Sequence, residues 1–322
     1  LYRKDENLTS HVNHDPGDHN FGQENREAFY RVVGRHFFAG DAAFDAKEIP
    51  CKGELKTAAQ LAVEMPAGNA TFLSLAKGLS AALPRAGSAP LREIVKAKEF
   101  RVTAERAGAE GRAVFWRLRL DEAFTIPAVE FAPPAEPKGT TVIFSEAGRA
   151  TLAAEVDRLL AAGRRVIAVD PFYYGESKIQ KRDFLFALLV AATGERPLGI
   201  QASQIAAVAR WAGGPVTVAA VGPRASLVAL VAGAIEEKAI ARLELRKSYG
   251  TLREVLEAGL GVDKAPELFC FGLLEAYDIP QIASQVAPRP VSFLDAGDRA
   301  KAELSGLKAR YAQLGSDFDP LR

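Results

Sequence analysis

The residues best placed to do chemistry lie where an apolar, β-branched run passes directly into an Ala/Leu-rich segment. Val216–Val221 predicts a buried strand, Leu227–Ala234 predicts a helix, and Gly222-Pro223-Arg224-Ala225-Ser226 joins the two. In acyl-transfer enzymes a strand–turn–helix of this kind carries G-x-S-x-G, and its sharp turn exposes the central serine as the nucleophile. Here Arg224 stands at the central position, and a protonated guanidinium has no lone pair with which to attack.

Ser226 is the hydroxyl in this motif that a shifted frame would offer as the nucleophile. It lies two residues inside the predicted helix, so its hydroxyl is expected to point along the helix and away from the turn. We therefore interpret Ser226 as the small packing residue at the end of the motif. Gly222 remains the residue that permits the turn.

A general base is missing from most of the chain. All four histidines, His11, His14, His19 and His36, precede residue 37. A Ser-His-acid triad built only from residues after 98 is therefore impossible by composition.

Composition argues against several kinds of partner. The 322 residues contain 41 Lys plus Arg and 40 Asp plus Glu, and this balance gives no electrostatic reason to expect nucleic acid or a membrane surface. No apolar run reaches the roughly 18–20 residues that span a bilayer. The two cysteines, Cys51 and Cys270, are expected to be free thiols. We expect no nucleic-acid partner, no membrane segment and no cofactor.

The order of the predicted elements indicates an α/β protein. Three strands follow in quick succession and predict an antiparallel opening: Phe100–Ala104, Ala113–Leu120 and Ala128–Phe131. The later strands alternate with helical stretches, and they are expected at Thr140–Phe144, Val166–Val169, Val216–Val221, Ala241–Leu245 and Val291–Leu294. This alternation predicts a mostly parallel sheet with helices on both faces and an antiparallel N-terminal edge.

The first hundred residues have a different character. Residues 1–48 consist of a polar loop that contains three of the histidines, followed by a helix expected at Glu24–Ala39. The histidine spacing matches no zinc pattern, so we interpret this loop as solvated and expect no metal site. Residues 49–98 are predicted to be a helical connector broken by prolines, and residues 99–322 the main domain.

Several motifs together resemble a known family. They are the loop Ser145-Glu146-Ala147-Gly148 after a strand, the turn Asp170-Pro171-Phe172-Tyr173-Tyr174-Gly175-Glu176-Ser177, the Gly222–Ser226 turn, and Ala287-Pro288-Arg289-Pro290 before the last strand. In this order they resemble acetylxylan-esterase-like and dienelactone-hydrolase-like α/β-hydrolases over about residues 99–299. The resemblance implies an α/β-hydrolase fold and carboxylic-ester hydrolysis as the family's activity.

The resemblance also shows where this chain departs from the family. Asp298 stands near the position of the family's catalytic acid, with Asp295 beside it, so Asp298 is interpreted as a vestigial acid. Where relatives place His-Gly-Gly-like oxyanion residues, this chain has Glu146 and Gly148. A carboxylate at that place opposes the negative charge that develops in acyl transfer. The main domain is therefore expected to be degenerate.

Residues 1–48 separately resemble the end of a second domain of the same family, in which a loop histidine precedes the last helix. His19-Asn20-Phe21 ahead of the expected helix fits that place, which makes His19 the orphaned base of a preceding domain. The chain begins at Leu1 without a Met or a signal pattern. We therefore expect a C-terminal fragment of a tandem protein, with the tail of one hydrolase domain and a second, degenerate one.

Arg224 is awkward at a helix N-terminus, which already carries about half a positive charge, and it therefore needs an anion nearby. One hypothesis pairs Arg224 with Glu146 or with a carboxylate of the Asp295/Asp298 loop. In the other hypothesis, Arg224 and the free N–H groups of the helix bind an anionic ligand such as a uronic acid.

The loop of Asp170, Tyr173 and Tyr174 is open to two interpretations. Its aromatic side chains either receive a sugar ring at the carboxyl edge of the sheet or fold over the core.

Three functions follow from these residues. We prefer a non-catalytic hydrolase-like domain that packs on the preceding hydrolase domain of the same chain, an acetylxylan-type esterase. The first alternative is an active carbohydrate or small-ester esterase that uses His19 or residues outside this chain. The second alternative is a module that binds an acidic or carbohydrate ligand at the former active site.

Overall fold

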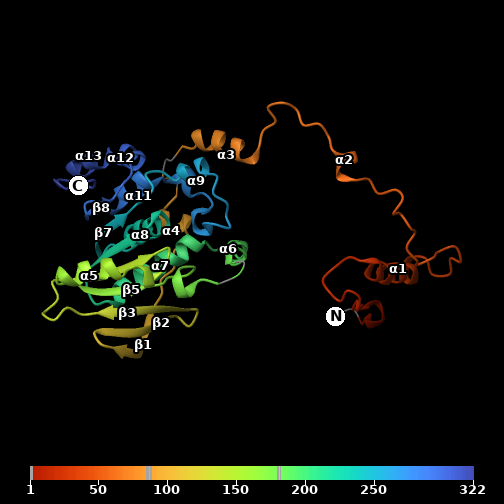
Figure 1. The fold of residues 1–322 in the computed structure, drawn as a ribbon, viewed down its shortest axis with the longest axis horizontal. Coiled ribbons are helices and arrows are strands. Elements are labelled where there is room, and N and C mark those ends of the chain that lie inside the picture. Colours follow the sequence, from red (N-terminus) through yellow and green to blue (C-terminus); the bar gives the residue numbers. More distant parts are fainter. Residues whose placement is uncertain (1–2, 85–86, 88, 180, 182) are drawn as a thin grey trace. The chain divides into compact units, whose positions relative to one another are not determined.

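A computed structural model describes residues 3–84, 87, 89–179, 181 and 183–322. Contacts within the chain divide it into two compact units, Leu1–Asn69 and Ala70–Arg322, which we call the first and second units (Figure 1). Among the described residues, no helix is both long enough and apolar enough to cross a membrane.

The first unit is built around one helix. It contains η1 (Asp5–Asn7), α1 (Gln23–Phe37) and α2 (Ala58–Leu61), and α1 corresponds to the helix expected at Glu24–Ala39. The chain after α1 folds back on the helix: Arg26 forms an ion pair with Glu48, and the rings of Phe38 and Phe44 stack 4.8 Å apart. No residue of α1 is buried within this unit.

The second unit contains one eight-stranded sheet with the strand order β1-β2-β3-β5-β4-β6-β7-β8. The pairs β1–β2, β2–β3 and β3–β5 are antiparallel, and the remaining pairs are parallel. The predicted α/β class, mostly parallel sheet and antiparallel N-terminal edge are therefore confirmed. The strands are β1 (Val102–Glu110), β2 (Ala113–Leu120), β3 (Phe124–Phe131), β4 (Thr140–Ser145), β5 (Arg165–Val169), β6 (Val216–Val221), β7 (Ile240–Arg246) and β8 (Val291–Leu294).

The third strand is longer than its sequence pattern predicts. β3 begins at Phe124 and runs through Pro127, a residue that usually argues against an interior strand because it donates no hydrogen bond. The pairing with β5 starts only at Ala128, so no partner strand on that side needs an N–H from Pro127. The carbonyl of Pro127 instead accepts a hydrogen bond from the N–H of Asp170 at 3.2 Å.

Helices and helical turns connect these strands. One helix expected at Ala300–Leu314 is two short helices, because Ser305 and Gly306 separate them. The elements are α3 (Phe72–Ala81), α4 (Leu91–Ile94), η2 (Arg149–Thr151), α5 (Ala153–Ala161), η3 (Gly175–Ser177), α6 (Asp183–Ala192), α7 (Pro197–Trp211), α8 (Pro223–Ile235), α9 (Arg253–Glu257), η4 (Pro266–Leu268), α10 (Leu273–Ala276), α11 (Ile279–Val286), α12 (Asp298–Leu304) and α13 (Leu307–Gln313).

Both faces of the sheet are covered. Neighbouring residues of β4 point to opposite faces, and Phe144 belongs to the larger hydrophobic cluster whereas Ile143 belongs to a smaller one beneath α5. The larger cluster includes most of α7 and α8. α8 is apolar on all sides, as expected of a helix enclosed by the core. The helix that follows the Gly222 turn is therefore held rigidly.

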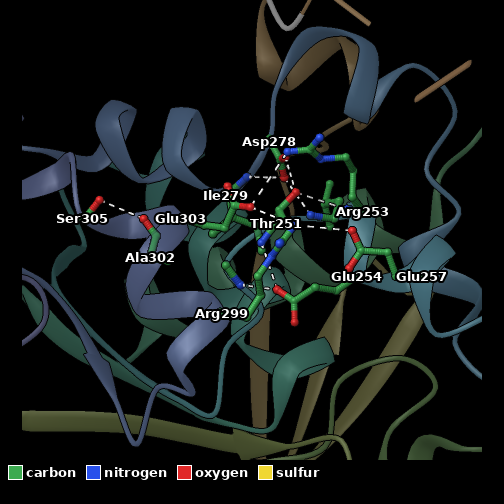
Figure 2. A network of polar contacts seen from close by, with 12 residues as sticks. Thr251, Arg253, Glu254, Glu257, Asp278, Ile279, Arg299, Ala302, Glu303 and Ser305 are labelled. Carbon is green, nitrogen blue, oxygen red and sulfur yellow. Dashed lines mark hydrogen bonds and ion pairs between the residues drawn. The ribbon is translucent and has the colours of Figure 1, made fainter. Parts of the chain in front are cut away.

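Polar contacts join the loops and helices that follow β7 (Figure 2). Asp278 caps α11 and accepts hydrogen bonds from the hydroxyl of Thr251 at 2.5 Å and from the N–H of Leu252 at 2.7 Å. On the surface nearby, Arg299 forms ion pairs with Glu257 at 3.4 Å and Glu303 at 2.9 Å. These contacts connect α9, α11 and α12, so the segment after β7 has a defined path.

Candidate functional site

The turn between β6 and α8 differs from one that exposes a nucleophile. Gly222 takes the left-handed conformation, with φ of 101°, and Pro223 is the first residue of α8. Arg224 is thus the second residue of a regular helix and is absent from the described non-glycine residues with positive φ. A side chain at Gly222 would also place its Cβ only 2.6 Å from Cδ of Glu146. The predicted strand–turn–helix is present, but the positive φ is at Gly222, where glycine adopts it without strain, and not at Arg224.

Glu146, from the loop after β4, lies at the N-terminus of α8. Its Oε2 accepts a hydrogen bond from the backbone N–H of Arg224 at 2.9 Å. Burial raises the pKa of the Glu146 carboxyl, and the N–H and the charge of Arg224 only partly oppose that rise. A helix N-terminus attracts anions because its first N–H groups are unpaired. Here the chain's own carboxylate occupies that position.

The guanidinium of Arg224 binds Glu267, which belongs to η4. Nε of Arg224 donates to Oε1 of Glu267, and Nη2 donates to Oε2 at 3.0 Å, so the pair is bidentate. Glu267 is fully buried, and the hydroxyl of Tyr174 donates to the same Oε1 at 3.1 Å. The Arg224 guanidinium also lies 5.5 Å from the centre of the Tyr174 ring.

This pairing corrects the expected partners of Arg224. The anion that the side chain binds is neither Glu146, which contacts only the backbone N–H, nor Asp295 or Asp298. The signal for Glu267 is a single carboxylate within the apolar stretch 265–270. An ionised side chain in such a stretch has to find a partner once the stretch is buried.

The charges of this cluster are fixed by their surroundings. Burial alone lowers the pKa of the Arg224 guanidinium, but the hydrogen bonds and negative charge of Glu267 raise it above its usual value. Burial raises the pKa of the Tyr174 phenol, which therefore stays neutral. A cationic arginine and a neutral tyrosine provide neither a nucleophile nor a general base.

In the second unit, Ser226 and Cys270 are both too buried for nucleophilic attack. Ser226 is completely buried, and its hydroxyl donates to the backbone carbonyl of Arg246 at 3.3 Å. The thiol of Cys270 is buried, which raises its pKa to about 12 and leaves it protonated.

The aspartates expected near the acid position lie after β8. Asp295 accepts a hydrogen bond from Nη1 of Arg246 at 2.7 Å, and Nε of the same arginine lies 3.3 Å from Glu155 on α5. Asp298 is the first residue of α12. Within the described part of the chain, no hydrogen bond or ion pair joins either aspartate to Arg224.

The loop after β5 is folded into the core. Tyr173 and Tyr174 are almost completely buried, although both were candidates for holding a sugar ring. Asp170 is also buried and accepts hydrogen bonds from the N–H groups of Arg149 at 2.7 Å and Glu176 at 3.0 Å. Gly175 is needed here, because a Cβ at this residue would lie 2.2 Å from Cγ of Asp170. This arrangement fits the interpretation of a loop folded over the core.

His19 lies in an exposed loop of the first unit, ahead of α1. His11, earlier in the same loop, contacts Glu24 of α1, and 3.1 Å separates Nε2 of His11 from Oε1 of Glu24. Over the residues that the structure describes, no three His, Cys, Asp or Glu side chains gather in a way that could hold a metal ion.

The sheet order, the enclosed helix α8 and the Gly222 turn define the class of the second unit, which has an α/β-hydrolase fold. This confirms the resemblance to acetylxylan-esterase-like hydrolases at the level of the fold. Arg224 lies in the first turn of α8, directly after the strand–turn at which enzymes of this fold carry their nucleophile.

Comparison with solved structures gives the same fold. A candidate acetyl xylan esterase of Bacteroides fragilis superposes with a TM-score of 0.61 at 14% identity, over 77% of this chain and 80% of that chain. An acetyl xylan esterase from Paenibacillus sp. R4 gives a TM-score of 0.42 at 11% identity, over 71% of this chain and 80% of that one. No family model and no curated protein sequence matches the chain.

Removing the carboxylate of Glu267 is expected to destabilise the second unit strongly. Glu267→Gln leaves the Arg224 guanidinium without its anion, which costs about 3–5 kcal/mol for a buried pair. Urea denaturation followed by circular dichroism measures this loss. Replacing both partners, in Arg224→Met/Glu267→Met, is expected to recover most of the lost stability.

The matched control is Glu257→Gln, which breaks the exposed pair with Arg299. Its two side chains are about half exposed, so the change is expected to cost less than about 1 kcal/mol. Equal effects of the two Glu→Gln substitutions would contradict a structural role for the Arg224–Glu267 pair.

The raised pKa of Glu146 predicts a pH-dependent stability. The folded chain binds the Glu146 proton more tightly than the unfolded chain does, so the stabilisation from this proton is present at low pH and is lost as pH rises through the folded pKa. Glu146→Gln stays neutral throughout. The stability of the unsubstituted chain relative to this variant should therefore fall as pH rises above about 4.3, the ordinary pKa of a glutamate, and level off above the raised folded pKa. Urea titrations at several pH values test this, and a difference that stays constant or grows with pH argues against it.

Proposed function

We propose that the second unit is a non-catalytic α/β-hydrolase-like domain that works together with a carboxylic-ester esterase domain, of the acetylxylan type, in the same polypeptide. The observation that carries this proposal is the pairing of Arg224 with the buried Glu267 at the former nucleophile position. The residue at the nucleophile position is an arginine bound to a buried carboxylate, and this side chain cannot attack an ester.

The other parts of an acyl-transfer site support the same proposal. Hydrolysis in this fold requires a histidine to take the proton of the nucleophile, and no histidine follows His36. The tetrahedral intermediate also requires N–H donors that are free to bind its oxyanion. In this fold one such donor is the N–H of the residue after the nucleophile, here Ala225, and Glu146 accepts hydrogen bonds from that N–H and from the N–H of Arg224. Replacing Arg224 by a serine would therefore supply neither the histidine base nor the free N–H donors.

The occupied helix N-terminus weighs against a binding module for anions at the former active site. A ligand carboxylate would have to displace Glu267 from the guanidinium and Glu146 from the backbone N–H. Both carboxylates belong to the chain, so they are present at a high effective concentration that a dissolved ligand does not match. The burial of Tyr173 and Tyr174 similarly removes the aromatic surface on which a sugar ring could stack.

The proposed partner follows from the first unit. Residues 1–48 resemble the end of an esterase domain, with His19 in a loop ahead of α1. In that place His19 serves as the base of a nucleophile on the preceding domain. We propose the preceding domain as the source of catalysis, and the second unit as a domain that packs on it.

The chain is expected to lack esterase activity of its own. Hydrolysis of p-nitrophenyl acetate by the 322-residue chain should not exceed that of the Ser226→Ala and His19→Ala variants. Arg224→Ser should not create activity, because no histidine is supplied with the new hydroxyl. Spectrophotometric assays of the four proteins at equal concentration provide the measurement. Turnover by the chain that disappears in Ser226→Ala or His19→Ala would overturn the non-catalytic assignment.

The association with an esterase domain predicts the sequence that precedes Leu1 in the natural gene. That sequence should encode a G-x-S-x-G motif between a strand and a helix, followed by a carboxylate after a later strand. Sequencing the gene upstream of the codon for Leu1 tests this expectation. An upstream sequence that lacks the motif would remove the proposed partner, whatever the outcome of the activity assay.

A further inference from the structure

A cavity of about 880 Å³ lies beside α5, on the face of the sheet that this helix covers. Small-molecule sites in proteins typically have volumes of about 300–1,000 Å³ and mostly apolar linings. The cavity is lined by the antiparallel strands β2 and β3, by the end of β5, by the loop between β4 and α5, by α5 itself and by η3. None of the residues of the Arg224–Glu267 pair lines it.

One wall of the cavity is an apolar row across three strands. Phe115 of β2 lies opposite Val129 of β3, and Val129 lies opposite Ala168 of β5. Phe131 lines the same cavity from β3. Residues directly opposite each other in a sheet point to the same face, so these side chains form one continuous surface. Phe115, Val129 and Phe131 are only half buried, although they are apolar.

Small residues create the space in front of this wall. Ala153 of α5 and Ala168 of β5 line the cavity together with Gly148. Leu160, from the last turn of α5, adds an apolar side chain at one end. The half-buried aromatic rings therefore remain accessible to a molecule that enters between the helix and the sheet.

The opposite end of the cavity is polar, and its charges already pair with one another. Arg149 binds Asp170 through Nη1 and Glu176 through Nη2, the latter at 2.9 Å. The exposed Asp157, on α5, also lines the cavity. Arg112 lies at the other end, next to the paired residues Ala113 and Phe131, and its Nη2 donates to the carbonyl of Ala132 at 3.0 Å. An anionic group at the Arg149 end would face the carboxylates of Asp170 and Glu176, and a cationic one would face Arg149. The charge pattern thus suits a ligand without net charge.

We infer that this cavity binds an uncharged, mostly apolar small molecule, whose apolar part lies on Phe115, Val129 and Phe131 and whose hydrogen-bonding group lies at the Arg149 end. Covering the half-buried side chains with an apolar ligand removes apolar area from water, and this is the main source of the binding free energy. The site does not use the Arg224–Glu267 pair, so it serves a non-catalytic domain equally well.

Two fluorescent probes with the same aromatic skeleton test the inference on the whole 322-residue chain. N-phenyl-1-naphthylamine is uncharged, and 1-anilinonaphthalene-8-sulfonate adds one negative charge. The neutral probe should bind saturably at one site, and the sulfonate should bind at least about tenfold more weakly, because its charge meets the carboxylates. Tighter binding of the sulfonate, or no saturable binding of the neutral probe, would overturn the inference.

A pair of substitutions on α5 locates the binding site. Ala153→Leu fills the cavity and is expected to weaken binding of the neutral probe by about tenfold or more. Ala154→Leu adds the same side chain at the next residue, which is exposed and does not line the cavity, so binding should remain unchanged. Thermal melts establish that both variants fold. Equal affinities of the two variants for the probe would place the site elsewhere and refute the proposal.

Discussion

The buried ion pair between Arg224 and Glu267 is the interaction on which the carboxyl edge of this sheet depends. A cation in the first turn of α8 is unfavourable because the helix dipole already places positive charge there. The structure resolves this with two carboxylates, Glu267 on the guanidinium and Glu146 on the backbone N–H. Tyr174 adds a hydrogen bond to Glu267 and brings the loop after β5 into the same cluster. Three segments distant in sequence, the loops after β4 and β5 and the η4 turn, are thereby fixed to one helix end.

The contacts that stabilise this region also leave its polar groups paired. A hydrolase needs a strained turn, an exposed nucleophile and unpaired N–H donors, all of which leave polar groups unsatisfied until a substrate arrives. Here the turn is relaxed at Gly222, the polar groups are paired and the tyrosines are buried. The α/β-hydrolase fold rests on the enclosed helix α8 and the apolar strands, and neither requires a set of catalytic residues. The cavity beside α5, which does not include Arg224 or Glu267, is the site that we propose for a small-molecule ligand.

Local patterns in the sequence were sufficient for the fold but not for the site. The runs Ala113–Leu120, Val216–Val221 and Val291–Leu294 predict three strands with their observed bounds, because burial and alternation are local properties. The partner of Arg224 could not be predicted in this way. Glu267 lies in the short turn η4, outside the longer helices and the strands. Its position next to Arg224 results from tertiary packing, which a hydrophobic periodicity in the sequence does not predict. The loss of strain at residue 224 likewise follows from Pro223 starting the helix, a feature that the motif spacing does not show.

Hydrogen exchange at the Arg224 side chain tests most directly whether this arginine is bound to Glu267. Nuclear magnetic resonance can measure hydrogen exchange at the Nε–H of single arginines, with Arg322, whose side chain is 84% exposed, as the internal reference. A locked pair predicts that the Nε–H of Arg224 exchanges far more slowly than that of Arg322 and loses this protection in Glu267→Gln. Exchange at Arg224 as fast as at Arg322 in the unsubstituted chain would contradict the central claim that this arginine is bound to Glu267.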